Sequence, residues 1–164
     1  ERVDSALLQA LQSRLPVYLL LHCNHARELT PSARAACERL ADAGIVLLSQ
    51  SVLMRGVNDD YASLEALMRA LVASRVKPHY LHHPDLAPGT GHFRLSPEQG
   101  IALLRELRQR LSGLCQPTYI LEIPGGHGKV PLGSVHFGRD EQGAWIEGLD
   151  GQRYPYRDDG VPLP

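Results

Sequence analysis

Hydrophobic residues follow two alternating patterns along this chain. Short and almost continuous apolar runs, typical of strands that are buried on both faces, occur four times. Each run is preceded by a longer segment in which apolar residues recur every three or four positions, the spacing of a helix that buries one face. The predicted helices are residues 5–15, 30–44, 61–75 and 96–113, and the predicted strands are residues 16–23, 45–53, 76–83 and 117–123.

Residues with capping and turn chemistry mark the ends of these helices. Thr30 suits an N-cap, Pro31 suits the first helical position, and Gly44 suits the stop. Ser96 and Gln99 have the spacing of a capping box. The helix boundaries and the hydrophobic period therefore support the same assignment.

Alternation of strand and helix predicts an α/β fold in which parallel strands are joined by right-handed crossovers. Strands that are apolar on both faces favour a barrel or a doubly wound sheet. After Gly133 the pattern changes to short mixed strands separated by the turn signals "DEQG" and "LDG". We therefore expect an α/β part over residues 1–133 and a small β-meander or hairpin tail over residues 134–164.

Composition says less about the function than the pattern of hydrophobic and polar residues does. The chain has 164 residues, enough for one domain with a core, and its formal net charge of −1 gives no electrostatic reason to expect nucleic acid or an anionic membrane as a partner. Its three cysteines lie far apart in no metal-like spacing, which fits a reducing, cytoplasmic setting. The apolar runs are too short to span a bilayer.

Polar residues gather where the predicted strands end. Because ligands of parallel α/β folds bind beyond the carboxyl ends of the strands, side chains at these positions predict an active site. Any one of them alone has an ordinary structural interpretation, such as a hydrogen-bonded core histidine or a turn aspartate. The residues at these ends are His22, Asn24, His25 and Glu28, then Gln50, then His82, His83, Asp85 and His92, then Glu122, His127 and Lys129.

The glycine-rich stretch "LEIPGGHGKV" contains Lys129 but does not fit a phosphate-binding P-loop. That motif needs a glycine where Ile123 stands and a hydroxyl residue where Val130 stands. Glycine-rich backbone does permit close approach of a bulky ligand, although a plain flexible turn is the commoner fate of such clusters. A lysine amine held in a pocket can form a Schiff base with an aldehyde, and pyridoxal phosphate is the aldehyde most used for this purpose.

Four segments together resemble the carboxyl-terminal half of the lysine 2,3-aminomutase family, over roughly Val17 to Gly133. They are "HCNHARELTP", "ACERLADAGIVLLSQSVLMRGVND", "HHPDLAPGTGHFR" and "QPTYILEIPGGHGKVPLG". The resemblance implies part of a TIM-like (β/α) barrel of the radical S-adenosylmethionine type. It also implies an isomerase that interconverts L-lysine and β-lysine, using pyridoxal 5'-phosphate, S-adenosylmethionine and a [4Fe–4S] cluster. Some short bacterial members make β-lysine for elongation factor P, a branch that this sequence leaves open.

The same resemblance implies roles for particular residues. Lys129 matches the lysine that binds pyridoxal phosphate, and is thereby the expected catalytic residue. Asp85 and Glu122 match carboxylates that receive the ammonium group of a lysine substrate, although the second is usually aspartate in the family. The other residues expected around the cofactors are His82, Gly125, Gly126, Gly128, His22, Asn24 and Gln50.

One family feature is missing. No CxxxCxxC motif occurs in the chain, and Cys23, Cys37 and Cys115 cannot supply it. Because the chain also opens on Glu1, we expect a fragment that cannot generate the radical alone. The expected partner is a small-molecule substrate, lysine, with no nucleic acid and no membrane, and association between copies is left open.

Three other functions compete with this interpretation. Histidines and an aspartate at strand ends favour a zinc-dependent hydrolase, although their spacing matches no known signature. The candidate zinc ligands are His22, His25, His83, Asp85 and His92. A mutase that acts on glutamate and a non-catalytic assembly half, associating through unpaired strand edges, are the remaining alternatives.

Overall fold

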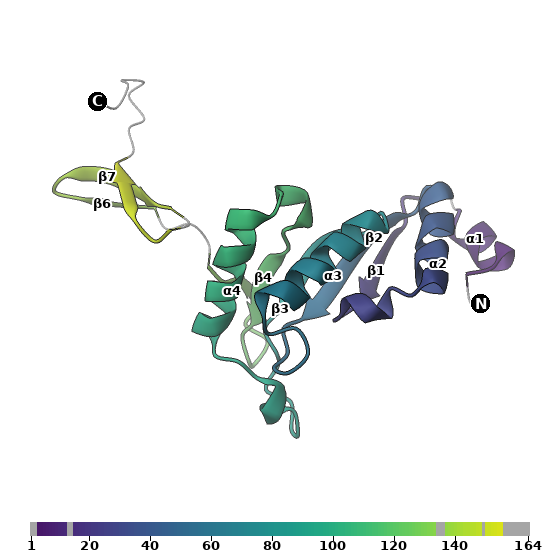
Figure 1. The fold of residues 1–164 in the computed structure, drawn as a ribbon, viewed down its shortest axis with the longest axis horizontal. Coiled ribbons are helices and arrows are strands. Elements are labelled where there is room, and N and C mark those ends of the chain that lie inside the picture. The colour runs from purple at the N-terminus through teal and green to yellow at the C-terminus, as the bar shows by residue number, and fades with distance from the viewer. Residues whose placement is uncertain (1–2, 13–14, 134–136, 149, 156–164) are drawn as a thin grey trace. The chain divides into compact units, whose positions relative to one another are not determined.

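The computed structural model describes residues 3–12, 15–133, 137–148 and 150–155. The chain divides into two compact units, Glu1–Leu132 and Gly133–Pro164, and each is described by itself (Figure 1). The helices of the first unit are α1 Ser5–Leu11, α2 Pro31–Asp42, α3 Tyr61–Ala73 and α4 Pro97–Arg110. Its strands are β1 Tyr18–His22, β2 Val46–Val52, β3 Lys77–His82, β4 Thr118–Glu122 and β5 Lys129–Pro131.

The first unit is built on a single sheet with the strand order β1-β2-β3-β4-β5. The first four strands pair in parallel, which confirms the predicted α/β class. β5 pairs antiparallel with β4, and the sequence analysis did not predict it. Because only three residues form β5, its pattern is too short to distinguish from a loop.

The helix ends follow their predicted chemistry. The Thr30 hydroxyl accepts a hydrogen bond from the Ala33 amide at 3.3 Å, and Pro31 opens α2. The predicted capping box of α4 is also present, with the Ser96 amide donating to Gln99 Oε1 and the Gln99 amide donating to Ser96 Oγ. These bonds satisfy amides that a helix leaves unpaired at its start.

The helices pack on one face of the sheet and form the core there. Figure 1 shows α2, α3 and α4 following one another across the sheet, in the order of the strands. Leucine side chains of α3 are fully buried against alternate residues of the strands, such as Leu81 of β3 and Tyr119 of β4. The buried leucines and methionine of α3 are Leu64, Leu67, Met68 and Leu71.

The opposite face of the sheet has no covering layer among the described residues. Its apolar side chains at the β1 edge are exposed, with Tyr18 at 60%, Val46 at 43% and Leu20 at 39%. Strands that are apolar on both faces predict burial on both faces, whereas here the second face is buried only in part, at Ile120 of β4, which is 2% exposed. We call this uncovered side of β1–β5 the open face.

The second unit contains the predicted small antiparallel meander. Its strands are β6 Phe137–Asp140, β7 Gly143–Glu147 and β8 Arg153–Pro155, and they pair in chain order. In the part of the chain that the structure describes, no helix is both long and apolar enough to cross a bilayer.

Candidate active site

Lys129 and Glu122 form an ion pair at the end of the open face. The two residues are direct neighbours across the antiparallel pair of β4 and β5. Lys129 Nζ lies 3.0 Å from Glu122 Oε2, and both side chains are 46% exposed. The Lys129 ammonium is therefore held by a residue of the neighbouring strand β4.

A tight hairpin between β4 and β5 fixes this pairing. The Ile123 amide donates to the Gly128 carbonyl at 2.9 Å, which closes the turn. Gly125, Gly126 and Gly128 have φ values of +88°, +80° and +94°, a backbone region that side-chain-bearing residues rarely adopt. The predicted role of these three glycines at the cofactor stays a prediction, but the glycines are needed for the turn that aligns Lys129 with Glu122.

His82 lies on the same face, one strand away. It pairs in parallel register with Ile120 of β4, and Ile120 is two residues before Glu122, so all three side chains point to one side of the sheet. The buried His82 Nε2 has no hydrogen-bond partner among the described residues. Burial lowers the pKa of His82, and the Lys129 ammonium lowers it further, while Asp85 and Glu122 act to raise it. The fold therefore favours the neutral imidazole, and its Nε2 is a buried polar atom without a partner among the described residues.

His22 and Gln50 extend this row of polar groups toward β1. They pair directly with each other, and Gln50 pairs with Tyr80, two residues before His82. The rings of Tyr80 and His82 lie edge to face with centroids 5.8 Å apart, as expected for neighbours on one side of a strand. The structure therefore brings His22 and Gln50 to the open face, together with His82 and the Lys129–Glu122 pair.

Asn24 has a structural role in the fold. Its Oδ1 accepts a hydrogen bond from the Val52 amide at 2.8 Å, and its carbonyl accepts one from Asn58 Nδ2 at 2.8 Å. Asn58 is fully buried and also donates to the Val52 carbonyl, which ties the ends of β1 and β2 together. The predicted contact of Asn24 with a cofactor stays a prediction. Sequence reasoning missed Asn58, whose only signal is its place in the turn "RGVNDD".

Asp85 lies in the loop after β3, beside an apolar hollow. Arg94 holds this loop through the backbone, donating from Nε to the Asp85 carbonyl at 3.1 Å and from a terminal nitrogen to the Ala87 carbonyl at 2.8 Å. The Asp85 side chain remains exposed. The hollow has a volume of about 150 Å³ and is lined by Val52, Met54, Pro84, Asp85, Ala87, Thr90 and Phe93.

Lys77, the only other lysine of the chain, is occupied elsewhere. Its Nζ donates to the carbonyls of Gly113, Leu114 and Gln116 at 3.3, 2.9 and 2.9 Å. It opens β3, whereas His82 ends that strand, so the two lysines serve opposite ends of the sheet. Burial lowers the pKa of Lys77.

The proposed zinc site of the alternative hydrolase does not form in the described residues. No three histidine, cysteine, aspartate or glutamate side chains come together there in a way that could hold a metal ion. His25 instead accepts from the Arg27 amide at 3.1 Å, and His83 Nδ1 lies 2.8 Å from the Tyr119 hydroxyl. Two of the five candidate ligands are thus engaged in the fold.

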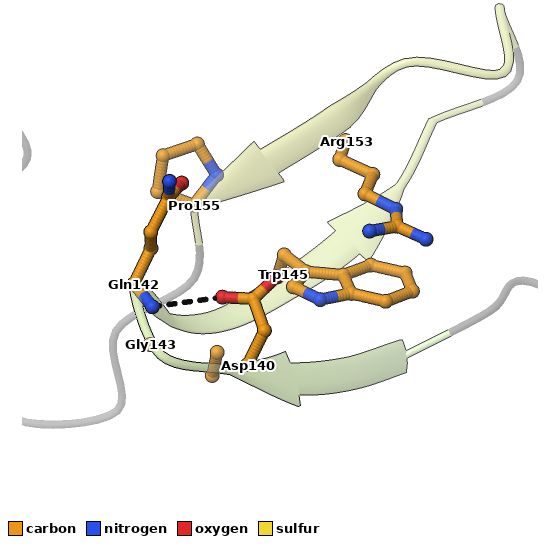
Figure 2. Close-up of a pocket in the computed structure, with 7 residues that line it drawn as sticks. Asp140, Gln142, Gly143, Trp145, Arg153 and Pro155 are labelled. Carbon is orange, nitrogen blue, oxygen red and sulfur yellow. Dashed lines mark hydrogen bonds between the residues drawn. The ribbon is translucent and has the colours of Figure 1, made fainter.

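The meander of the second unit has a hollow of its own, of about 190 Å³ (Figure 2). The Arg153 guanidinium stacks over the Trp145 ring, 4.0 Å from its centroid, and the Gln142 amide donates to Asp140 Oδ1 at 2.9 Å. The sequence analysis assigned no chemistry to these residues. Arginine on an indole face contributes about 0.5–1 kcal/mol at an exposed site, which adds to the strand pairing of this small sheet.

Comparison with known proteins finds relatives along most of the chain. A putative L-lysine 2,3-aminomutase of Treponema pallidum is 44% identical over 156 residues, which are 92% of this chain and 44% of that protein. The L-lysine 2,3-aminomutase of Fusobacterium nucleatum is 42% identical over 132 residues, or 80% of this chain and 31% of that protein. A glutamate 2,3-aminomutase of Clostridioides difficile is 39% identical over the same number of residues.

These relatives are much longer than the region they share with this chain. The chain spans 31% to 44% of the length of the two lysine aminomutase relatives above. No family model matches the chain.

Proposed function

We propose that this chain, a relative of the lysine 2,3-aminomutase family over most of its length, carries the amine-handling part of such an enzyme's active site. The resemblance expected from the sequence is confirmed by those relatives. The observation that carries the proposal is the Lys129–Glu122 pair beside a buried, unpartnered His82 nitrogen on the open face. The reaction class is an isomerisation in which an amino group moves between neighbouring carbons, with L-lysine as the substrate.

Lys129 is the residue that would hold pyridoxal phosphate. The chain has two lysines, and the amine of Lys77 already donates to three carbonyls at the other end of β3. Lys129 is half-exposed on the open face, and among the described residues its ionic partner is Glu122. Such an amine is accessible to an aldehyde, and His82 Nε2 offers a neutral imidazole nitrogen to a polar substituent of the cofactor.

The cofactors supply chemistry that side chains cannot. Pyridoxal phosphate would hold the migrating amino group, and S-adenosylmethionine with a [4Fe–4S] cluster would supply the radical that starts the migration. Residues His22 and Gln50, which extend the open face away from Lys129, are proposed to line the S-adenosylmethionine side of the cavity. The open face itself is proposed to be the interior of a (β/α) barrel completed by other parts of the protein.

The cysteines of this chain do not fit the cluster. Cys23, Cys37 and Cys115 are buried and unpaired by any disulfide. Burial raises the pKa of the Cys23 thiol to about 11 and also raises the pKa of Cys37. Cluster ligands are thiolates, whereas burial of Cys23 and Cys37 favours their neutral thiols. No step of the reaction is assigned to them, and the ligands of the cluster are proposed to come from another segment.

Asp85 is the proposed partner for the cationic end of the substrate. Its side chain is exposed beside the apolar hollow, which suits a ligand with a hydrocarbon stem and a charged tip. A carboxylate at this point favours lysine over an acidic amino acid, because two like charges repel. The glutamate-specific relative keeps glutamate as the second candidate substrate.

The test of this function is covalent capture of the cofactor. The full-length protein is incubated with pyridoxal phosphate, reduced with borohydride, digested, and searched by mass spectrometry for a pyridoxyl group. We expect the group on Lys129, and we expect Lys129→Arg to reduce labelling at least about tenfold.

The matched control is Lys77→Arg, which removes the other amine of the chain and keeps its charge. We expect labelling in this variant to equal that of the wild-type protein. Undiminished labelling in Lys129→Arg, or a wild-type protein that captures no cofactor, would exclude the proposed role.

A further inference from the structure

Glu122 has a partner that its family-based assignment does not include. By resemblance it is one of two carboxylates for the substrate's ammonium group. In the structure its Oε2 lies 3.0 Å from Lys129 Nζ, the amine proposed to hold the cofactor. The Lys129 ammonium occupies one oxygen of the Glu122 carboxylate, which leaves less of its acceptor capacity and charge for a substrate ammonium.

The backbone places Glu122 and Lys129 within reach of each other. Glu122 is the last residue of β4, Lys129 is the first residue of β5, and the two stand directly opposite each other. Side chains at opposed positions of an antiparallel pair lie close enough to interact. The glycine-rich turn that joins the strands keeps them in this register.

Asp85 differs from Glu122 in this respect. It lies in a loop that Arg94 holds by backbone carbonyls, so the guanidinium does not engage the carboxylate itself. Within the described part of the chain, the Asp85 carboxylate has no hydrogen bond and no ion pair. Glu122 is therefore already paired with Lys129, whereas the Asp85 carboxylate can bind a ligand.

We propose that Glu122 is the counterion of the free Lys129 amine, and that preference for a cationic substrate falls on Asp85. This inference rests on the proposed function and assigns a different task to each carboxylate of that site. Glu122 is a positioning residue, because it acts through Lys129 and does not need to touch the substrate.

Glu122 would act as a counterion when an incoming amine replaces Lys129 on the cofactor. The incoming nitrogen would take over the double bond to the cofactor's aldehyde carbon, the bond between that carbon and Lys129 Nζ would break, and the three hydrogens of the incoming ammonium group would end on Nζ. Atoms and charge balance without water or an oxidant. The product is a Lys129 ammonium, which Glu122 stands 3.0 Å away to receive.

This exchange does not depend on what the other end of the amine carries. Loss of the Glu122 charge therefore weakens the exchange equally for every amino acid. Loss of the Asp85 charge weakens it only for amino acids with a cationic side chain. L-lysine and L-norleucine form a matched pair for this comparison, because they share a carbon chain and differ in the terminal ammonium.

The experiment measures the amine exchange in the full-length protein loaded with pyridoxal phosphate. The cofactor's absorbance is titrated with each of the two amino acids, with no requirement for turnover. For Glu122→Gln we expect the half-saturating concentrations of both ligands to rise by the same factor, about threefold to fivefold. For Asp85→Asn we expect a rise of about tenfold for lysine and none for norleucine.

Two further variants sharpen the result. Glu122→Asp keeps the charge on a shorter stem, and we expect it to restore part of the loss for both ligands. Glu106→Gln removes a carboxylate from an ion pair of the same 3.0 Å length on the outer surface of α4, and we expect no change for either ligand. Circular dichroism of each variant shows that the fold is kept.

Two outcomes would overturn the inference. In the first, Glu122→Gln raises the half-saturating concentration of lysine and leaves that of norleucine unchanged, which would mean that Glu122 binds the substrate's ammonium group. In the second, Glu122→Gln changes the half-saturating concentration of neither ligand, which would mean that the ion pair has no role in the exchange. Failure of the proposed function looks different, because a wild-type protein without borohydride-trapped cofactor on Lys129 gives no absorbance change to titrate.

Discussion

Two consecutive histidines show how differently the two faces of the sheet are built. His83 follows β3 on the helix-covered side, where its Nδ1 lies 2.8 Å from the hydroxyl of the fully buried Tyr119. His82 ends β3 on the open face, and its buried Nε2 has no partner among the described residues. Burial lowers the pKa of both imidazoles. On the covered face the buried Tyr119 hydroxyl has a partner in His83, whereas His82 Nε2 on the open face and Ser49 Oγ on the covered face have none among the described residues.

The covered face is closely packed around Tyr119. Its hydroxyl lies against the backbone of α4 at Gly100, where a Cβ atom would overlap the hydroxyl and stand 2.5 Å from Cζ of the ring. Burial raises the pKa of Tyr119 to about 12, and the nearby Glu98 carboxylate adds to this. A glycine inside a helix normally costs stability, and here it makes room for a buried hydrogen bond.

The largest expected effect on the covered face comes from Gly100→Ala. Replacing a helical glycine by alanine usually stabilises a helix by about 0.5–1 kcal/mol. Here we expect the overlap with Tyr119 to dominate and to lower the free energy of unfolding by about 2–3 kcal/mol. Urea denaturation measures the change, and a stabilised Gly100→Ala variant would contradict this account of the packing.

A double variant tests whether the tyrosine is the cause. Removing the hydroxyl by Tyr119→Phe relieves part of the overlap, although the ring carbons remain close. Gly100→Ala should therefore cost less in the Tyr119→Phe background than in the wild-type protein. Equal costs in the two backgrounds would mean that the hydroxyl is not the atom in conflict.

A second prediction concerns alkaline pH. The folded pKa of Tyr119, about 12, is above the unfolded value of about 10, so the fold favours the protonated hydroxyl. The corresponding stability is complete below about pH 10 and is lost as the pH rises towards 12, by about 2–3 kcal/mol in all. Unfolding curves across this range should show the loss.

Tyr119→Phe should remove this alkaline loss, and it should cost about 1 kcal/mol at neutral pH because the hydrogen bond with His83 is gone. The matched control is Tyr18→Phe on the open face, where the ring is 60% exposed. That variant should keep the wild-type alkaline profile. A profile that Tyr119→Phe leaves unchanged would rule out the buried hydroxyl as its source.

Most of the fold could be predicted from the sequence, because the helices and strands of the covered face have regular hydrophobic spacing. The spacing of Leu64, Leu67 and Leu71 predicted the buried side of α3, and the caps at Thr30 and Ser96 marked helix starts within a residue. β5 was missed because a three-residue strand has no period to read. The exposure of the open face was also missed, because an apolar strand looks the same whether its second face is covered or not.

The candidate site was predictable only in part. Parallel strands place their carboxyl ends at one edge, and this rule correctly grouped His22, Gln50 and His82. The rule says nothing about which side chains bond to one another. The partner of Glu122 depends on the unpredicted β5, and the Asn24 side chain is occupied by the Val52 amide, twenty-eight residues away along the chain.

The smallest expected effect has the opposite sign and distinguishes the two faces most sharply. His82→Phe removes a buried nitrogen that has no partner among the described residues, so we expect the free energy of unfolding at pH 7 to rise by about 0.5–1 kcal/mol. The lowered pKa of His82 means that the wild-type fold loses stability as the pH falls below about 6.5, and the variant should lose less. The neighbouring variant His83→Phe should instead destabilise the protein at pH 7, because it leaves the Tyr119 hydroxyl buried without its bond. If both variants destabilise alike, His82 is a structural histidine like its neighbour, and the open face has no polar atom reserved for a ligand.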